Sequence, residues 1–548
     1  MSVLSWLFDR FLGLPKATTP AVEVTRDLSV PMPDGVVLVA DRYRPRGAGP
    51  LPVVLVRTPY GKHRLLAKGL AQVLARRGMQ VLVQDVRGTF GSGGRFSAFH
   101  QERDDGLATA AWLREQPWCD GRLAMTGVSY LGYTQWAVGP YLDPPLEAMC
   151  LGVTASEFTT LFYPGGVLAL HNLLTWSALI GTQEEVRLGG LLPDPRRQRR
   201  LRRAMAHVPI STSDVAAIGK KVPFMREVAA HAEPGDEFWS GTENNAAVAK
   251  LTTPTSMVTG WWDLLLPAQL RDFVALREAG RHSRIVIGPW GHDLGAIRAL
   301  LVDQVSWLSA HLLGHTDRSH RSPVRLYLQR ADRWLDFDQW PPARSTPTSL
   351  FLLPGRGLGW EAPPEGTVPA TFTYDPAHPT RSTGGPLLDV RLSKQRGNRG
   401  IELRSDVLVY TGDPLPRDLD LVGPVTASVY VRTDTGHGDL FVRLCDVDPS
   451  GASRNVTDGI VRLPQEVGEV RAEIELHPTG YRFKRGHRLR VQVAGGAFPR
   501  FARNHGTGEP VGRAVRTRTT RFEVFHDAGR PSVVTLPVLD SDQDTTSR

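Results

Sequence analysis

The 548-residue sequence predicts an α/β protein that carries a second, all-β region at its C-terminal end. In the first third, short apolar runs alternate with stretches of helical spacing, which is typical of a parallel sheet with crossover helices. The same alternation resumes near residue 255, whereas residues 156–244 lack buried-strand signals and indicate a helical insertion. From about Pro323, short alternating strands with Gly, Pro and Asp turns indicate a sandwich or jelly roll.

Individual elements follow from these periodicities. Buried parallel strands are expected at Leu51–Val56, Met79–Val83, Arg122–Thr126, Thr255–Thr259 and Ile285–Ile287. Helices that cover the sheet are expected at Leu65–Arg77, Asp104–Glu115, Pro267–Ala279 and Ile297–Leu313. The clearest strands of the all-β region are Val324–Gln329, Ser349–Leu353, Val407–Thr411, Val425–Val431, Leu440–Val447 and Leu489–Val493. The expected domains are an N-terminal amphipathic segment (1–22), an α/β domain in two parts (23–155 and 245–320), a helical cap (156–244) and a jelly roll (321–548).

Composition excludes several classes of protein. With 41% hydrophobic and 22% charged residues, the chain has the material for a globular core. Its three cysteines form no CxxC pair, so neither a disulfide framework nor a zinc ribbon is supported, and no metal or cofactor is expected. The net charge of +9 includes an arginine run at residues 196–203, which we interpret as a solvated helix face because no aromatic residues or reading module point to nucleic acid.

The N-terminal segment has apolar residues at helical spacing from Leu4 to Leu12 but no basic region before them, so it is a poor signal peptide. We expect a helix docked on the protein itself, with a peripheral membrane contact as the alternative. No apolar stretch reaches about 18 residues, so no stable membrane insertion is expected. A cytoplasmic location follows, with a small-molecule substrate as partner; the sequence leaves a homodimer open.

A candidate nucleophile follows the strand Arg122–Thr126. The chain runs on through Gly127-Val-Ser-Tyr-Leu-Gly132 into a helical stretch. A serine on a tight strand-to-helix turn is the nucleophile elbow of α/β hydrolases, and Ser129 occupies that place. The GxSxG pattern would put its second glycine at position 131, where Leu131 stands, so an ordinary glycine-bearing turn is the alternative.

A serine nucleophile needs a base and a carboxylate that orients it. In this fold they follow the serine in the order Asp, His at the ends of later strands. Asp263 follows Thr255–Thr259 and His292 follows Ile285–Ile287, which predicts the triad Ser129–Asp263–His292. Asp293 is a rival carboxylate, but its place after the histidine disfavours it.

Two donors are candidates for the oxyanion hole. The first is the backbone N–H of Tyr130, directly after the nucleophile. The second should come from the loop after Leu51–Val56, which has no run of glycines to present another backbone N–H. The hydroxyl of Tyr60 is the candidate there, and a tyrosine packed in the loop is the alternative.

These residues stand within motifs that resemble the cocaine esterase-like CocE/NonD serine hydrolases, relatives of X-Pro dipeptidyl-peptidases and α-amino acid ester hydrolases. The motifs extend over nearly the whole chain from about residue 23: Arg57-Thr-Pro-Tyr60, Gln84-Asp-Val-Arg-Gly88, Gly91-Ser-Gly93, Trp118-Cys-Asp-Gly121, Gly127-Val-Ser-Tyr-Leu-Gly132, Trp176-Ser-Ala-Leu-Ile-Gly181, Gly260-Trp-Trp-Asp263, Gly288-Pro-Trp-Gly-His292, Asp406-Val-Leu-Val-Tyr410, Asp458-Gly-Ile-Val-Arg462, Gly486-His-Arg-Leu-Arg-Val-Gln492 and Phe498-Pro-Arg500.

The resemblance implies an α/β-hydrolase domain with an inserted helical cap and a C-terminal jelly roll. It also implies the roles already assigned to the triad and to Tyr60, and its S-Y-x-G pattern accounts for Leu131. The implied substrate pocket includes Leu161, Phe162, Trp176 and Leu265. Leu161 and Leu265 stand where the resemblance would put aromatic side chains, so we expect a wider, more aliphatic pocket.

The expected activity is therefore hydrolysis of carboxylic esters, and of amides as an extension, through an acyl-enzyme. The same triad would also serve an X-Pro dipeptidyl-peptidase or an α-amino acid ester hydrolase or acylase. A non-catalytic binding protein is the remote alternative, since only the jelly roll suggests it.

Overall fold

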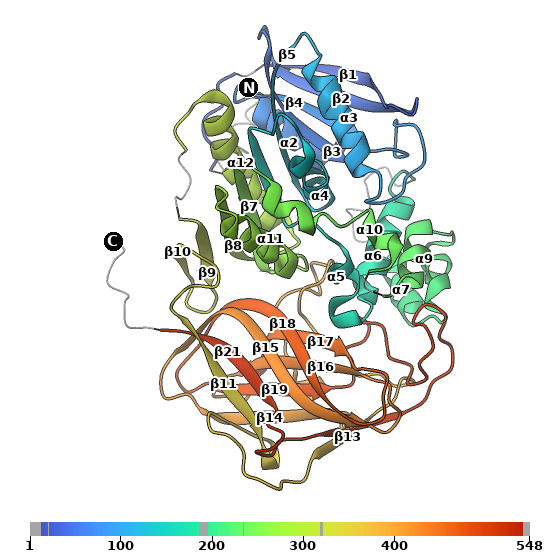
Figure 1. Cartoon of the computed structure of the whole chain (residues 1–548), viewed down its shortest axis with the longest axis vertical. Coiled ribbons are helices and arrows are strands. Elements are labelled where there is room, and N and C mark those ends of the chain that lie inside the picture. The colour runs from blue at the N-terminus through green and yellow to red at the C-terminus, as the bar shows by residue number, and fades with distance from the viewer. Residues whose placement is uncertain (1–12, 20, 186–194, 234, 318–321, 541–548) are drawn as a thin grey trace.

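The computed structural model describes residues 13–19, 21–185, 195–233, 235–317 and 322–540, and it confirms the predicted fold class. The helix expected near the N-terminus falls largely within residues 1–12, outside this range. Figure 1 shows the α/β part at the top, the cap helices beside it and the β-rich part below. None of the described helices combines the length and apolarity that crossing a bilayer requires.

The first sheet of the described chain has ten strands in the order β1-β2-β4-β3-β5-β6-β7-β8-β9-β10. Their bounds are β1 Val22–Pro31, β2 Val37–Pro45, β3 Leu51–Thr58, β4 Gln80–Asp85, β5 Cys119–Val128, β6 Ala148–Gly152, β7 Thr255–Trp262, β8 Ser283–Gly291, β9 Val324–Leu328 and β10 Arg333–Phe337. The strands from β4 to β9 along this order pair in parallel, and antiparallel pairs close both edges.

Helices cover both faces of this sheet: α2 Leu65–Ala75, α3 Glu102–Arg114, α4 Tyr130–Trp136, α11 Leu266–Glu278 and α12 Leu294–Leu313. Alternate residues of β3 enter different cores, because successive side chains of a strand point to opposite faces. Val53 packs in the core that includes residues of α3 and α11, and Val54 in the core that includes residues of α2 and α12. Burial on both faces explains why the central strands read as continuous apolar runs.

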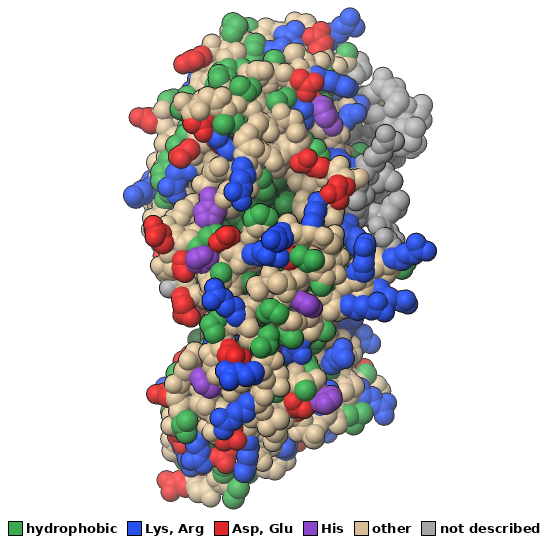
Figure 2. Space-filling model, turned by 90° about the vertical axis from the view of Figure 1, so that its right-hand side faces the viewer, with side chains coloured by type: hydrophobic (Ala, Val, Ile, Leu, Met, Phe, Trp, Pro, Cys, Tyr) green, Lys and Arg blue, Asp and Glu red, His purple; other side chains and the backbone are tan. Residues whose placement is uncertain are grey.

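The cap consists of short helices between β6 and β7. They are α5 Thr159–Phe162, α6 Leu170–Thr182, α7 Pro195–Met205, α8 Ser213–Ile218, α9 Pro223–Ala230 and α10 Glu237–Ser240. The arginine run forms α7, and most of its guanidinium groups are exposed. Figure 2 shows the side of the molecule that carries the cap, where Lys and Arg side chains are interspersed with Asp and Glu.

The C-terminal part forms a second sheet of eleven strands within the described residues. The bounds are β11 Ser345–Leu353, β12 Gly357–Gly359, β13 Ala370–Tyr374, β14 Val407–Pro414, β15 Leu419–Thr433, β16 Asp439–Val447, β17 Ser453–Arg462, β18 Glu469–Phe483, β19 Arg488–Ala494, β20 Thr520–Val524 and β21 Val533–Leu539. Its strands curl around an apolar core of their own, in which the rings of Phe372 and Phe522 stack at 4.7 Å.

One strand close to the expected boundary at residue 320 pairs with the first sheet rather than with the jelly roll. The sequence assigns Val324–Gln329 to the jelly roll, but β9 pairs with β8 and extends the first sheet, and β10 follows it at the edge. The reason is that β9 alternates between buried and half-buried residues as the jelly-roll strands do, so its own pattern does not reveal its partner. The second sheet therefore begins at β11, beyond residue 337.

The two sheets meet closely at the end of β7. The Trp261 ring is held within the first sheet, where its indole N–H donates to the carbonyl of Tyr327 of β9 at 2.6 Å. A Cβ at Gly480 of β18 would lie 2.4 Å from the Trp261 ring, so only glycine fits at this contact. Because Asp263 follows two residues later, the junction supports the loop that carries this carboxylate.

We expect Gly480→Ala to lower the free energy of unfolding by about 1–3 kcal/mol, the cost of overpacking a close contact. Thermal unfolding would measure the loss, with Gly468→Ala as the control, since a Cβ at Gly468 meets nothing within 4 Å. Equal melting temperatures for the two variants would show that the junction adapts to a methyl group.

Candidate active site

The turn at Ser129 joins β5 to α4 in a conformation that few residues adopt. Ser129 has φ 56° and ψ −122°, in the positive-φ region that side chains disfavour. A Cβ at Gly127 would lie 2.4 Å from Cβ of Leu131, and one at Gly132 would lie 2.5 Å from Thr154. Glycine is thus required at positions 127 and 132. Position 131 needs no glycine, because the side chain of Leu131 packs in the core, and this explains the departure from the GxSxG pattern.

The expected base and its carboxylate meet at the ends of β7 and β8. Nδ1 of His292 lies 2.7 Å from Oδ2 of Asp263, which is fully buried. The other oxygen of Asp263 accepts the N–H of Leu265 at 2.8 Å, so both oxygens are held. This arrangement fixes the imidazole with Nε2 available to the cavity that Ser129 also lines.

Asp293, the rival carboxylate, is engaged elsewhere. It caps the N-terminus of α12 by accepting the N–H of Gly295 at 2.8 Å, and it pairs with Lys394 of the C-terminal part at 3.1 Å. These contacts agree with the expectation that Asp263, rather than Asp293, orients the histidine.

Tyr60 lies in the loop after β3 with its hydroxyl beside the nucleophile. Burial raises the pKa of Tyr60 to about 12, while hydrogen bonds with Trp176 and Ser129 act in the opposite direction. The phenol therefore stays protonated near neutral pH and can donate a hydrogen bond. The loop is held from the cap, where Gln183 donates to the carbonyl of Pro59 at 2.8 Å.

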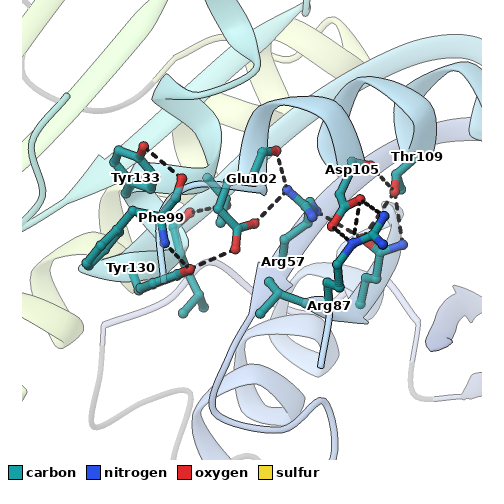
Figure 3. A network of polar contacts seen from close by, with 12 residues as sticks. Arg57, Arg87, Phe99, Glu102, Asp105, Thr109, Tyr130 and Tyr133 are labelled. Atoms are coloured by element: carbon teal, nitrogen blue, oxygen red, sulfur yellow. Dashed lines mark hydrogen bonds and ion pairs between the residues drawn. The ribbon is translucent and has the colours of Figure 1, made fainter. Parts of the chain in front are cut away.

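A buried polar network holds the other expected donor, Tyr130 (Figure 3). The Tyr130 hydroxyl donates to Glu102 at 2.7 Å and accepts the N–H of Phe99 at 2.9 Å. Glu102 pairs with Arg57 at 2.8 Å, and both side chains are almost entirely buried. Arg57 is the penultimate residue of β3, just before the Tyr60 loop. The ion pair and the Tyr130 hydrogen bond together therefore connect the two chain segments that carry the expected oxyanion donors.

Removing one partner of such a pair would leave a buried charge uncompensated, which makes the network costly to disturb. Burial raises the pKa of Glu102, and the Arg57 guanidinium and the Tyr130 hydroxyl act against that rise. The network continues from Arg57 to Gln84 at 2.9 Å and from Gln84 to Thr109 of α3 at 3.0 Å. It therefore anchors the expected oxyanion hole to the sheet and to a helix behind it.

The cavity at Ser129 has an empty volume of about 400 Å³. It brings together Ser129, His292, Tyr60 and Tyr130 with all four expected pocket residues, Leu161, Phe162, Trp176 and Leu265. Sequence reasoning missed further lining residues: Phe99, Phe158, Asn172, Leu264 and Leu388. Phe99 and Phe158 make the wall more aromatic than expected, and four leucines and Asn172 line other parts of it.

Leu388 shows that the C-terminal part contributes to the cavity. Its N–H donates to Asn172 of α6 at 3.2 Å. Farther along the same segment, Ser393 donates to the carbonyl of Trp262 at 3.4 Å. The segment therefore contacts both the cap and the loop that carries Asp263, and no periodic sequence signal marks it.

One group of potential metal ligands lies away from this cavity. Asp27, Asp41 and His63 place ligand atoms within 4.8 Å of one another. The ammonium of Lys62 lies 2.9 Å from Asp27 and 3.9 Å from Asp41, so a cation of the chain itself already balances these carboxylates.

Comparisons with known proteins agree with this architecture. The X-Pro dipeptidyl-peptidase (S15) family profile matches residues 34–293, and the X-Pro dipeptidyl-peptidase C-terminal non-catalytic domain matches residues 319–535. The cocaine esterase of Rhodococcus sp. (strain MB1 Bresler) is 31% identical over 94% of this chain and 98% of its own.

Two solved structures share the fold. An aminopeptidase from a marine sediment archaeon, Thaumarchaeota archaeon, has a TM-score of 0.81 at 22% identity, covering 96% of this chain and 99% of its own. An α-amino acid ester hydrolase has a TM-score of 0.80 at 22% identity, covering 96% and 98%. Both chains thus share the entire arrangement of α/β part, cap and jelly roll.

We expect Tyr60→Phe to lower kcat on a chromogenic ester by about 10²–10³, the usual effect of losing one oxyanion donor, with little change in KM. The variant removes only a hydroxyl, so the fold should persist. Tyr141→Phe is the matched control, because Tyr141 lies outside the cavity. A kcat for Tyr60→Phe within about threefold of wild type, or about 0.7 kcal/mol, would exclude the hydroxyl as the donor.

Proposed function

The chain belongs to the CocE/NonD family of serine hydrolases, and from this premise we propose that it cleaves carboxylic esters with an uncharged acyl group. The substrate class is inferred from the side chains that line the cavity. Aromatic and leucine side chains dominate it, and none of its described lining residues carries a carboxylate. An apolar acyl group gains from burial in such a cavity, whereas an ammonium group would lose its hydration without a partner.

In the proposed reaction, Ser129 Oγ attacks the ester carbonyl while His292 Nε2 takes its proton. Asp263 holds the imidazole through Nδ1 and stabilises the imidazolium that forms. The Tyr60 hydroxyl and the Tyr130 N–H donate to the oxyanion. The intermediate collapses as the ester C–O bond breaks and His292 returns the proton to the leaving alcohol. Water then repeats the sequence on the acyl-enzyme and releases the acid.

The second candidate is a dipeptidyl-peptidase, which the S15 family match favours. Such a substrate presents a free amine, and a buried ammonium needs a carboxylate close by. Asp263, the carboxylate of the expected triad, is fully buried and already accepts two hydrogen bonds. The cavity therefore favours the ester over the peptide.

The proposal includes a small-molecule substrate, no nucleic-acid partner and a cytoplasmic location. The unpaired state of Cys119, Cys150 and Cys445 supports a reducing compartment. A homodimer and a peripheral membrane contact of the N-terminal segment are compatible with this function.

Turnover of p-nitrophenyl esters beside Xaa-Pro p-nitroanilides separates the two candidates. We expect kcat/KM to be higher for butyrate and benzoate esters than for the anilides by at least about 10², because an aryl ester is a more reactive acyl donor than an anilide and because the anilides must also bury an ammonium group without a counter-charge. Ser129→Ala sets the background for each substrate. A higher kcat/KM for the anilides would instead establish the peptidase.

A further inference from the structure

The hydroxyl of Tyr60 receives a hydrogen bond from the cap. Nε1 of Trp176, on α6, lies 3.0 Å from the Tyr60 oxygen. An indole N–H can only donate, so the tyrosine oxygen must be the acceptor in this pair. The phenolic hydrogen of Tyr60 therefore cannot point toward Trp176 and is left for a different acceptor.

The indole is fixed by its neighbours. Trp176 is 8% exposed, and its ring stacks on Phe99 at 5.4 Å with an interplanar angle of 21°. The Tyr130 ring lies nearly parallel to it at 6.2 Å, and Phe224 of the cap meets it edge-on at 4.8 Å. Because the ring is held by several aromatic neighbours, the direction of its N–H is held as well.

Ser129, the expected nucleophile, lines the same cavity as Tyr60 and influences the pKa of its hydroxyl. The indole N–H thus binds one lone pair of the Tyr60 oxygen. The O–H bond of Tyr60 is then free to point toward Ser129, where the oxyanion forms. The hydrogen bond that Tyr60 accepts from Trp176 also strengthens the hydrogen bond that the Tyr60 hydroxyl donates, because successive hydrogen bonds polarise one another. Both effects favour the geometry that an oxyanion hole requires.

We propose that Trp176 is a positioning residue of the oxyanion hole, which acts through the Tyr60 hydroxyl in addition to lining the acyl pocket. The inference rests on the proposed role of Tyr60 as oxyanion donor. If Trp176 only lined the pocket, its substitution would affect substrate binding whether or not Tyr60 carried its hydroxyl. If Trp176 positions that hydroxyl, its substitution should no longer affect kcat once the hydroxyl has been removed.

A double-mutant cycle of Trp176→Phe and Tyr60→Phe tests this difference, with kcat for a p-nitrophenyl ester normalised to the active sites titrated with a fluorophosphonate. In the wild-type background we expect Trp176→Phe to lower kcat about fivefold, the value of one neutral hydrogen bond. In the Tyr60→Phe background the same substitution should change kcat by less than about twofold.

Phe158→Leu is the matched control, because Phe158 lines the same cavity without an N–H. Its effect on kcat/KM should be equal in both backgrounds. If Trp176→Phe does not fold, benzothienylalanine at position 176, in which sulfur replaces the indole N–H, preserves the ring area.

The outcomes separate the two claims. An equal fall in kcat for Trp176→Phe in both backgrounds, with Tyr60→Phe itself strongly impaired, would overturn the positioning role alone. An unimpaired Tyr60→Phe would overturn the role of Tyr60 and the positioning role with it. Loss of the Trp176 effect only where the Tyr60 hydroxyl is absent would establish the proposal.

Discussion

The sharp turn at Ser129 is the constraint on which the rest of the site depends. A serine at φ 56° persists only where the surrounding packing compensates for its strain. Gly127 and Gly132 permit the close approach of the neighbouring backbone and of Thr154, and the buried Glu102 holds Tyr130 on the far side of the turn. The proposed nucleophile is therefore presented by packing that extends well behind it.

The site is also divided among the three parts of the chain. The α/β part supplies Ser129 and His292, with Asp263 behind the histidine, the cap supplies Trp176, and the C-terminal part supplies Leu388. The parts also contact each other close to the site. Gln183 of the cap bonds to Pro59 in the Tyr60 loop, and Lys394 of the C-terminal part pairs with Asp293, next to His292. A displacement of the cap would thus alter both the pocket and the environment of the Tyr60 hydroxyl.

Sequence patterns predict what is local and periodic. The central parallel strands were predictable because burial on both faces makes them apolar throughout. The triad could be predicted from the sequence because each of its members follows such a strand. Strand β6, with the sequence AMCLG, has only five residues and none that is β-branched, so it gives no comparable signal. Phe99 and Leu388 lie in irregular segments, and Trp176 meets Tyr60 across 116 residues, so their place in the cavity depends on tertiary packing.

The central claim is that catalysis passes through a covalent acyl group on Ser129. Mass spectrometry of the full chain, quenched in acid during turnover of a p-nitrophenyl ester, tests it most directly. The account predicts a mass increase equal to the acyl group less one hydrogen, located in the peptide that contains Ser129. An unmodified chain in a wild-type sample that has released nitrophenol in a stoichiometric burst, or an acyl group on another residue, would contradict it.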